Sequence, residues 1–240
     1  HGFDVATGDE RLAYVPKGVF SKLTSLTQPS YEHTYTVDGH PFTGDFRTGS
    51  GGSLGSGSNW RTALVSGLGG GGKGYFVLDV TSPGSFVATS AGAASTVLID
   101  TTDGADVDIG HLYGEPVTDA SNPERAVNIA KLNNGRWAAI LGNGVNSTSE
   151  KAVLLIQYLD GDRSLVKIPL DSTGGNGNGL AYPQVIAIDG NGTADVAYAG
   201  DMLGNLWKID LSGTTPSAWK SYFPIGGGTP APLFVARDSS

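Results

Sequence analysis

The sequence predicts an all-β chain, a modified β-propeller of four-stranded blades with long loop insertions. Its apolar runs are short, rich in Val, Ile, Tyr and Phe, and bounded by Gly, Asn, Asp and Pro, which is the pattern of strands and turns. Glycine supplies 37 of the 240 residues, roughly double the usual share of about 7%, yet it follows no collagen period. One plan of paired strands also recurs along the chain, as expected of a repeat architecture.

Each repeat contains an apolar strand ending in Gly, a polar Gly-rich turn, and a second strand ending in Asp. The three repeats are residues 59–80, 135–160 and 194–211. A preceding strand is expected to begin near Pro41, Ala126 and Gln184, and a following strand to lie at 96–99, 165–168 and 220–223. Four consecutive strands per unit are the plan of a propeller blade. An ordinary β-sandwich with three similar hairpins is the alternative.

The two ends of the chain fit the same plan. Residues 1–16 are expected to form the last half of one blade, and residues 231–238 the first strand of another. The chain, 1–240, is therefore expected to be part of a single β-propeller domain, truncated at both ends, with about three full blades and parts of two. Because the repeats exceed the roughly 40–50 residues of compact blades, long loops are expected at 48–58, 101–122 and 172–180. A short helical pattern at 19–26 predicts a surface insertion.

Composition excludes several classes of function. The chain has 15 Lys+Arg against 23 Asp+Glu, a net charge of −8, and nucleic-acid binding needs clustered cations to neutralise phosphates. No run reaches the roughly 18 apolar residues of a membrane span. The absence of Cys excludes disulfides, Cys-ligated metals and thiol catalysis. We expect no nucleic-acid partner and no membrane span in this chain.

Catalytic motifs are also missing. None of the four His belongs to an HExxH pair, and no GxSxG nucleophile elbow occurs. The Gly-rich run at 67–74 lacks the Gly-Lys-Ser/Thr ending of a phosphate loop, and a hairpin turn explains it better. Trp60, Trp137 and Trp207 are expected to pack between blades. No catalytic or cofactor-binding residue is therefore assigned, and we expect the chain not to be an enzyme.

The segment 187–201 contains a candidate metal site. Four residues with side-chain oxygens alternate with small residues: Asp189, Asn191, Thr193 and Asp195. Ca²⁺ takes six to eight oxygen ligands, and the intervening Gly190 and Gly192 permit a tightly wrapped backbone. An EF-hand is excluded because Gly200 stands where its bidentate Glu would be. A plain turn between two blade strands, where Asp, Asn and Gly are common, is the alternative.

A second acidic stretch lies at residues 99–111. Its four carboxylates are Asp100, Asp103, Asp106 and Asp108. A metal site is conceivable there, but a solvated acidic loop is the favoured interpretation, because charge runs usually face water.

Long motifs give the chain a resemblance to a known family. They include GxGGKGYFxLDVT at 69–81 and YAGD-x-x-GNLWK at 198–208. With residues 1–16 and the stretches between, the sequence resembles, in order and over essentially its whole length, the C-terminal domain of the PilY/PilC family of type IV pilus tip-associated adhesin and assembly proteins. The resemblance implies a modified β-propeller that binds calcium in one blade and has no enzymatic activity.

The resemblance also implies a place and a role. The protein would lie outside the cell or on its surface, at the pilus tip of the fimbrium, with outer-membrane association as a further option. There it would act with minor pilins to promote pilus assembly or oppose retraction, and so support adhesion and twitching motility. The host or surface receptor is not identified by the sequence.

The family's calcium loop falls on residues 187–195, with calcium as the expected cofactor and regulator. The matching positions are Ala187, Asp189, Asn191, Thr193 and Asp195. The Thr193 position contributes its backbone oxygen in the family, and the Ala187 position usually carries Asp there. The present chain therefore lacks one carboxylate of the expected set.

Two other functions remain open at this stage. A quinoprotein-type propeller dehydrogenase also uses calcium, together with a pyrroloquinoline cofactor, but the chain offers no candidate catalytic base. A purely structural propeller scaffold would have the same blades without any dependence on an ion.

Overall fold

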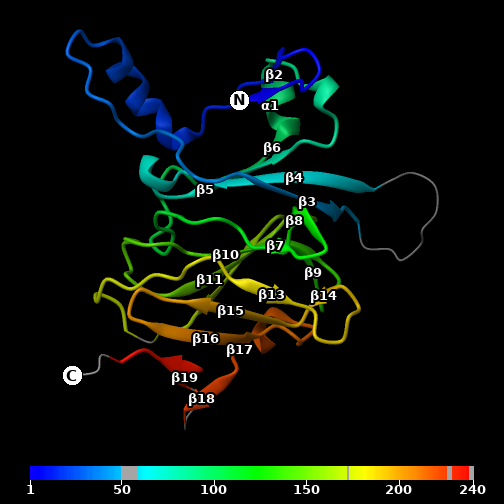
Figure 1. Cartoon of the computed structure of the whole chain (residues 1–240), viewed down its shortest axis with the longest axis vertical. Helices are drawn as coiled ribbons and strands as arrows, with labels where there is room; N and C mark the ends of the chain where they lie inside the picture. Colours follow the sequence, from blue (N-terminus) through cyan, green and yellow to red (C-terminus); the bar gives the residue numbers. More distant parts are fainter. Residues whose placement is uncertain (50–58, 172, 226–228, 238–240) are drawn as a thin grey trace.

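The computed structural model of the chain describes residues 1–49, 59–171, 173–225 and 229–237. In this part, short strands dominate, and three mainly antiparallel sheets succeed one another from top to bottom of Figure 1. The described sheets do not close into a ring. Each has the four consecutive strands expected of a blade, which confirms the predicted fold class and the three predicted repeats.

We name the three sheets the first, second and third blades, in chain order. The first blade pairs its strands in sequence order: β3 (Phe42–Arg47), β4 (Trp60–Gly67), β5 (Tyr75–Asp79) and β6 (Val97–Asp100). The second blade contains β9 (Ile129–Leu132), β10 (Trp137–Gly142), β11 (Val153–Tyr158) and β12 (Leu165–Pro169). The third blade contains β13 (Gln184–Ile186), β15 (Val196–Gly200), β16 (Asn205–Asp210) and β17 (Lys220–Ser221).

The end of the chain corrects one prediction. Residues 231–238 were expected to begin another blade, but β20 (Phe234–Val235) pairs antiparallel with β16, opposite Leu206. The two-residue β17 covers β16 only at Ile209 and Asp210. The start of β16 therefore has an edge open to β20, and the unpaired backbone groups of such an edge are a template for a further strand. The fourth strand of the third blade is thus made of two separate pieces.

The remaining strands form three small hairpins or pairings outside the blade plan. They are β1 (Gly2–Phe3) with β2 (Glu10–Leu12), β7 (Thr118–Asp119) with β8 (Asn122–Ala126), and β18 (Phe223–Ile225) with β19 (Thr229–Ala231). The strand, turn and strand predicted for residues 1–16 are present. A two-residue strand, β14 (Thr193–Ala194), joins the β9 edge of the second blade.

Helical segments are short. They are the α-helix α1 (Ser90–Thr96) and the 3₁₀ segments η1 (Lys17–Thr27), η2 (Gly69–Gly71), η3 (Pro83–Ser85) and η4 (Pro216–Ala218). The helical pattern predicted at 19–26 corresponds to η1, whose Val19 packs against Phe76 and Leu78 on the outer face of the first blade. No helix in the described ranges is long and apolar enough to cross a membrane.

The second blade is buried on both faces. Along β10, Ala139 and Leu141 pack against the first blade, whereas Ala138 and Ile140 pack against the third. This alternation follows from the period of two in a strand. Every residue of β11 is buried, and each such Leu or Ile contributes about 1.5–3 kcal/mol. Stacking of blades, rather than any single sheet, therefore forms the core.

Aromatic residues reinforce the two seams between blades. Trp60 and Trp137 meet edge to face across the first seam, with ring centroids 5.3 Å apart. Trp207 is buried in the second seam. The buried Tyr75 hydroxyl of the first blade donates to Gln157 Oε1 of the second at 2.7 Å. The predicted packing role is confirmed for Trp137 and Trp207, whereas Trp60 is 43% exposed and meets Trp137 from the surface.

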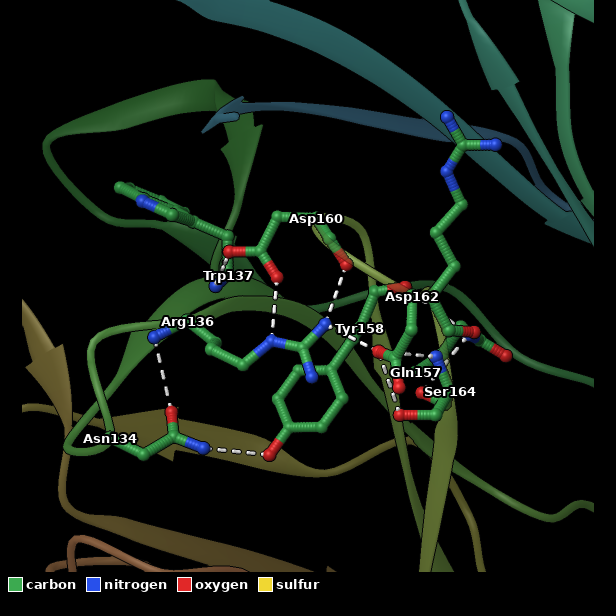
Figure 2. Close-up of polar contacts among 9 residues, drawn as sticks. Asn134, Arg136, Trp137, Gln157, Tyr158, Asp160, Asp162 and Ser164 are labelled. Atoms are coloured by element: carbon green, nitrogen blue, oxygen red, sulfur yellow. Dashed lines mark hydrogen bonds and ion pairs between the residues drawn. The ribbon is translucent and has the colours of Figure 1, made fainter. Parts of the chain in front are cut away.

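The Asp that ends the second strand of each repeat has a structural role. In the second blade, Asp160 accepts from Arg136 Nε at 2.8 Å and from the Trp137 backbone N–H at 3.1 Å. The same guanidinium binds Asp162 at 2.8 Å and lies 3.6 Å from the centre of the Tyr158 ring. Figure 2 shows these side chains together. Partial burial opposes the charge, but the hydrogen bonds to Asp160 and Asp162 raise the pKa of Arg136 above its usual value. This network ties β10 to the end of β11.

Candidate calcium loop

The candidate metal residues lie on the loop that joins β13 to β15, residues 187–195. The loop leaves the third blade and touches the second. Its β14 segment pairs in parallel with β9, with Thr193 opposite Lys131 and Ala194 opposite Leu132. The loop is therefore held at the seam between two blades.

Two successive turns shape the exposed tip of the loop. Asp189 Oδ1 accepts the Asn191 backbone N–H at 3.0 Å, and Asn191 Oδ1 accepts the Thr193 N–H at 2.7 Å. The backbone angles φ of Gly190 and Gly192 are 72° and 78°, a left-handed conformation that favours glycine. Asn191 Nδ2 also donates to Asp189 Oδ2 at 2.6 Å. The structure thus brings the first two predicted ligands together.

Asp195 lies at the base of the same loop. Its Oδ2 accepts the Ile188 backbone N–H at 2.8 Å, which closes the loop on itself. Its Oδ1 accepts from Asn133 Nδ2 at 3.1 Å. Among the described contacts, none joins Asp195 directly to Asp189 or Asn191. The four predicted residues therefore share one short loop, in two groups at its tip and base.

The donor chemistry of the loop fits a hard cation. Carboxylate, amide and backbone oxygens suit Ca²⁺ rather than a soft metal. No Lys or Arg within the described ranges forms an ion pair with Asp189 or Asp195. The described residues contain no group of three or more His, Cys, Asp or Glu arranged to hold a metal. An ion in this loop would rely on Asn191, backbone oxygens and water beside its two carboxylates.

In the second acidic stretch, three of the four carboxylates bind groups from other parts of the protein. Lys167 Nζ binds Asp106 Oδ1 at 2.6 Å and Asp108 Oδ2 at 2.8 Å. Asp100 accepts from the Tyr14 hydroxyl at 2.6 Å and from the Lys17 backbone N–H at 3.0 Å. Partial burial opposes ionisation, but hydrogen bonds, chiefly from Lys167, hold the pKa of Asp108 below its usual value. The stretch is an acidic loop, although Lys167, rather than water alone, balances two of its charges.

The YAGD-x-x-GNLWK motif forms the turn between β15 and β16. Asp201 accepts from the backbone N–H groups of Leu203 and Asn205, and from the side chains of Asn205, Trp207 and Asn178. Partial burial opposes the charge, yet these hydrogen bonds lower the pKa of Asp201. The motif that carries much of the family resemblance is therefore a structural turn.

The Gly-rich run at 67–74 is likewise a structural turn, between β4 and β5, as predicted. A Cβ atom on Gly71 would lie 1.8 Å from the backbone oxygen of Thr36. Only glycine allows this close approach of two backbone segments. The close contact explains the glycine there without any phosphate.

Sequence reasoning missed Asn133, the partner of Asp195 on the second blade. Its only local signal is its place in an Asn-Asn-Gly sequence, which is typical of turns. The contact with Asp195 joins residues 62 positions apart. No motif or spacing could have revealed it.

Comparisons with known proteins identify the family of the chain. The sequence model of the family described as "PilY1 beta-propeller domain" matches residues 1–222. A type IV pilus biogenesis factor PilY1 homolog of Xylella fastidiosa is 40% identical, over 99% of this chain and 15% of the relative. The type IV pilus biogenesis factor PilY1 of Pseudomonas aeruginosa is 36% identical, over 99% of this chain and 20% of the relative.

A solved structure gives the same result. The crystal structure of the Pseudomonas aeruginosa PilY1 C-terminal domain matches with a TM-score of 0.70 and 31% identity, over 100% of this chain and 44% of that chain. The present chain thus spans less than half of that domain, and a fifth or less of the curated relatives above. Since the family match, the sequence identities and the stacked four-stranded sheets all agree, the chain belongs to the PilY1 beta-propeller domain family.

Proposed function

We propose that the chain serves type IV pilus biogenesis, as a rigid propeller segment of a larger pilus-associated protein. The observation that carries the proposal is the 36–40% identity, across 99% of the chain, to proteins named type IV pilus biogenesis factors. The protein acts outside the cell, at the pilus tip or cell surface, where it promotes pilus assembly or opposes retraction with minor pilins as partners. Adhesion and twitching motility depend on it, and it has no enzymatic role.

The packing of the blades supports a mechanical role. A sheet buried on both faces, such as the second blade, cannot shift without exposing apolar surface to water, at about 25 cal/mol for each Å². A body of this kind presents its loops in fixed positions. The loop at 187–195 is one of them, because it is anchored across a seam.

The second part of the proposal is that calcium regulates this loop. Asp189 and Asp195 lie in one short loop without a cationic partner in the described part of the chain. A bound cation supplies the missing positive charge and orders the exposed tip of the loop, whose base is already held by β14. Asp189, Asn191, the backbone oxygen of Thr193, and Asp195 would hold it.

The pilus role is tested in the organism that carries the gene. The full-length protein is deleted, or replaced at its own locus by a variant carrying both Asp189→Ala and Asp195→Ala. Surface pili are counted by electron microscopy and twitching zones are measured. We expect deletion to abolish both, and the double variant to reduce them. Asp103→Ala, which removes an exposed carboxylate from the other acidic stretch, is the matched control and should behave as wild type.

The two parts of the proposal fail in different ways. Normal pili and twitching after deletion would contradict the role in pilus biogenesis. If deletion abolishes pili but the double variant resembles wild type, the chain is a scaffold without ion dependence, and only the calcium part is wrong.

Calcium binding itself is tested by thermal unfolding of the purified protein. At a calcium concentration 100 times Kd, binding to the native state adds about 2.7 kcal/mol. We expect a clear rise in Tm in millimolar calcium relative to chelator, and none for Asp195→Ala. An unchanged Tm in wild-type protein would contradict calcium binding.

A further inference from the structure

Asn133 is a side chain of the second blade that reaches the candidate calcium loop. It lies in the turn between β9 and β10 and is partly buried. Its Nδ2 is 3.0 Å from the backbone oxygen of Ala194, 3.1 Å from Asp195 Oδ1 and 3.2 Å from the backbone oxygen of Leu211. All three acceptors belong to the loop or the third blade. One amide group therefore bridges the seam between the two blades.

The backbone around Asp195 is held just as closely. Its N–H donates to Ile186 O at 3.0 Å, and its carbonyl accepts from the Leu211 N–H at 2.8 Å. These bonds place Asp195 between the beginning of the loop and the end of β16. Because the main chain is fixed, the carboxylate can turn only about its side-chain bonds. The contact with Asn133 limits that remaining rotation.

The contact between Asn133 and Asp195 differs from the other two. An amide group has only two hydrogens for its three neighbours, so the acceptors share them. A hydrogen bond to an ionised carboxylate is about twice as strong as one between neutral groups. The Asn133 amide donates to only one oxygen of the Asp195 carboxylate, Oδ1, while the Ile188 backbone N–H donates to the other, Oδ2. Each oxygen keeps lone pairs whose directions are then set by these two donors.

We propose that Asn133 is a positioning residue for the calcium loop: it orients the Asp195 carboxylate and couples cation binding to the seam between the second and third blades. The inference rests on the proposed binding of calcium. Mutation of a residue that hydrogen-bonds to a metal ligand typically changes metal affinity by about 10–100-fold. Coupling of this kind is reciprocal, so calcium also tightens the seam at β9, where β14 pairs.

The affinity is measured by calorimetric titration of calcium into the purified protein. Asn133→Ala is compared with wild type and with Asn134→Ala. The neighbouring Asn134 is a matched control, because its amide donates to the Tyr158 hydroxyl at 2.7 Å and does not touch the loop. We expect Asn133→Ala to weaken calcium binding by about 10–100-fold, and Asn134→Ala to leave it unchanged.

A second measurement follows the seam directly. Hydrogen exchange of the backbone amides at 129–132 is recorded with and without calcium. We expect calcium to slow exchange there in wild type and in Asn134→Ala, but not in Asn133→Ala. If Asn133→Ala fails to fold, Asn133→Asp takes its place in both measurements, because it keeps the shape of the side chain and removes the Nδ2 donor that contacts Asp195.

The outcomes separate this inference from the proposed function. If wild type binds no calcium, both the calcium proposal and the positioning role are overturned. If wild type binds calcium and Asn133→Ala binds it equally well, only the positioning role is overturned. Calcium binding without any slowing of exchange at 129–132 overturns the coupling to the seam.

Discussion

The two acidic stretches of this chain look alike in sequence and differ in the fold. In the stretch at 99–111, Asp106 and Asp108 both form ion pairs with Lys167. In the loop at 187–195, Asp189 and Asp195 have no such cation among the described residues. Lys167 comes from β12, about 60 positions further along the chain than the carboxylates it binds. Whether an acidic cluster is neutralised by the protein therefore depends on whether a Lys or Arg from a distant part of the sequence packs against it.

The electrostatics of the first stretch follow from that contact. Partial burial disfavours the charge on Lys167, but hydrogen bonds to Asp106 and Asp108 raise its pKa above the usual value. The lowered pKa of Asp108 and the raised pKa of Lys167 both favour the charged form, so these two charges compensate each other in part. The loop at 187–195 has no such ion pair in the described part of the chain, and it is the loop for which we propose calcium binding.

Removal of Lys167 gives the largest expected effect. Lys167→Met leaves Asp106 and Asp108 partly buried and without their shared cation, and we expect a loss of about 1–3 kcal/mol in the free energy of unfolding. Urea denaturation measures it. Arg11→Met, which breaks the more exposed pair with Asp4, is the control and should cost less than about 1 kcal/mol. Equal losses in both variants would contradict a distinct role for Lys167.

A new carboxylate at position 187 should make the loop at 187–195 differ more strongly from the stretch at 99–111, because it adds negative charge where no cation among the described residues balances it. Ala187 is partly buried at the start of the loop and offers no side-chain oxygen. Ala187→Asp adds the ligand that the family resemblance implies, and we expect calcium affinity to rise about tenfold, equivalent to about 1.4 kcal/mol. Calorimetric titration measures it. A lower affinity than wild type would show that the loop cannot admit a third carboxylate.

Acid should affect the first stretch through Asp108. Its pKa is lower in the folded protein than the ordinary value of about 3.9. The unfolded chain then binds more protons as the pH falls below that value, so the stabilisation is present above it and is lost as pH falls through the folded pKa. Urea midpoints between pH 5 and pH 2.5 should fall less steeply for Asp108→Asn than for wild type. Parallel curves would contradict the assignment.

The smallest effect is expected at Thr193. Its backbone N–H closes the turn with Asn191, and its proposed contribution to calcium is a backbone oxygen, which any residue supplies. Thr193→Ala should therefore leave calcium affinity unchanged, as measured by the same calorimetric titration as Ala187→Asp. A large loss would mean that the hydroxyl, rather than the carbonyl, faces the cation.

Local patterns were sufficient for much of this molecule. The strand pairs, the Gly-rich turn at 67–74 and the oxygen-bearing loop at 187–195 were all predicted, because each depends on residues close together in the chain. Alternation of apolar residues and turn-forming Gly and Asp act over a few positions. The long YAGD-x-x-GNLWK motif is likewise local, since Asp201 binds Asn205 and Trp207 within its own turn.

Contacts between distant segments were beyond those patterns. The pairing of β20 with β16, the bridge from Asn133 to Asp195, and the ion pairs of Lys167 each join residues about 30 to 60 positions apart. Such contacts form only when stacking of the blades brings the segments together, and their gain must exceed the entropy lost in closing the intervening loop. The local sequence does not predict whether the contact energy exceeds this loss of entropy. That depends on how the whole domain packs.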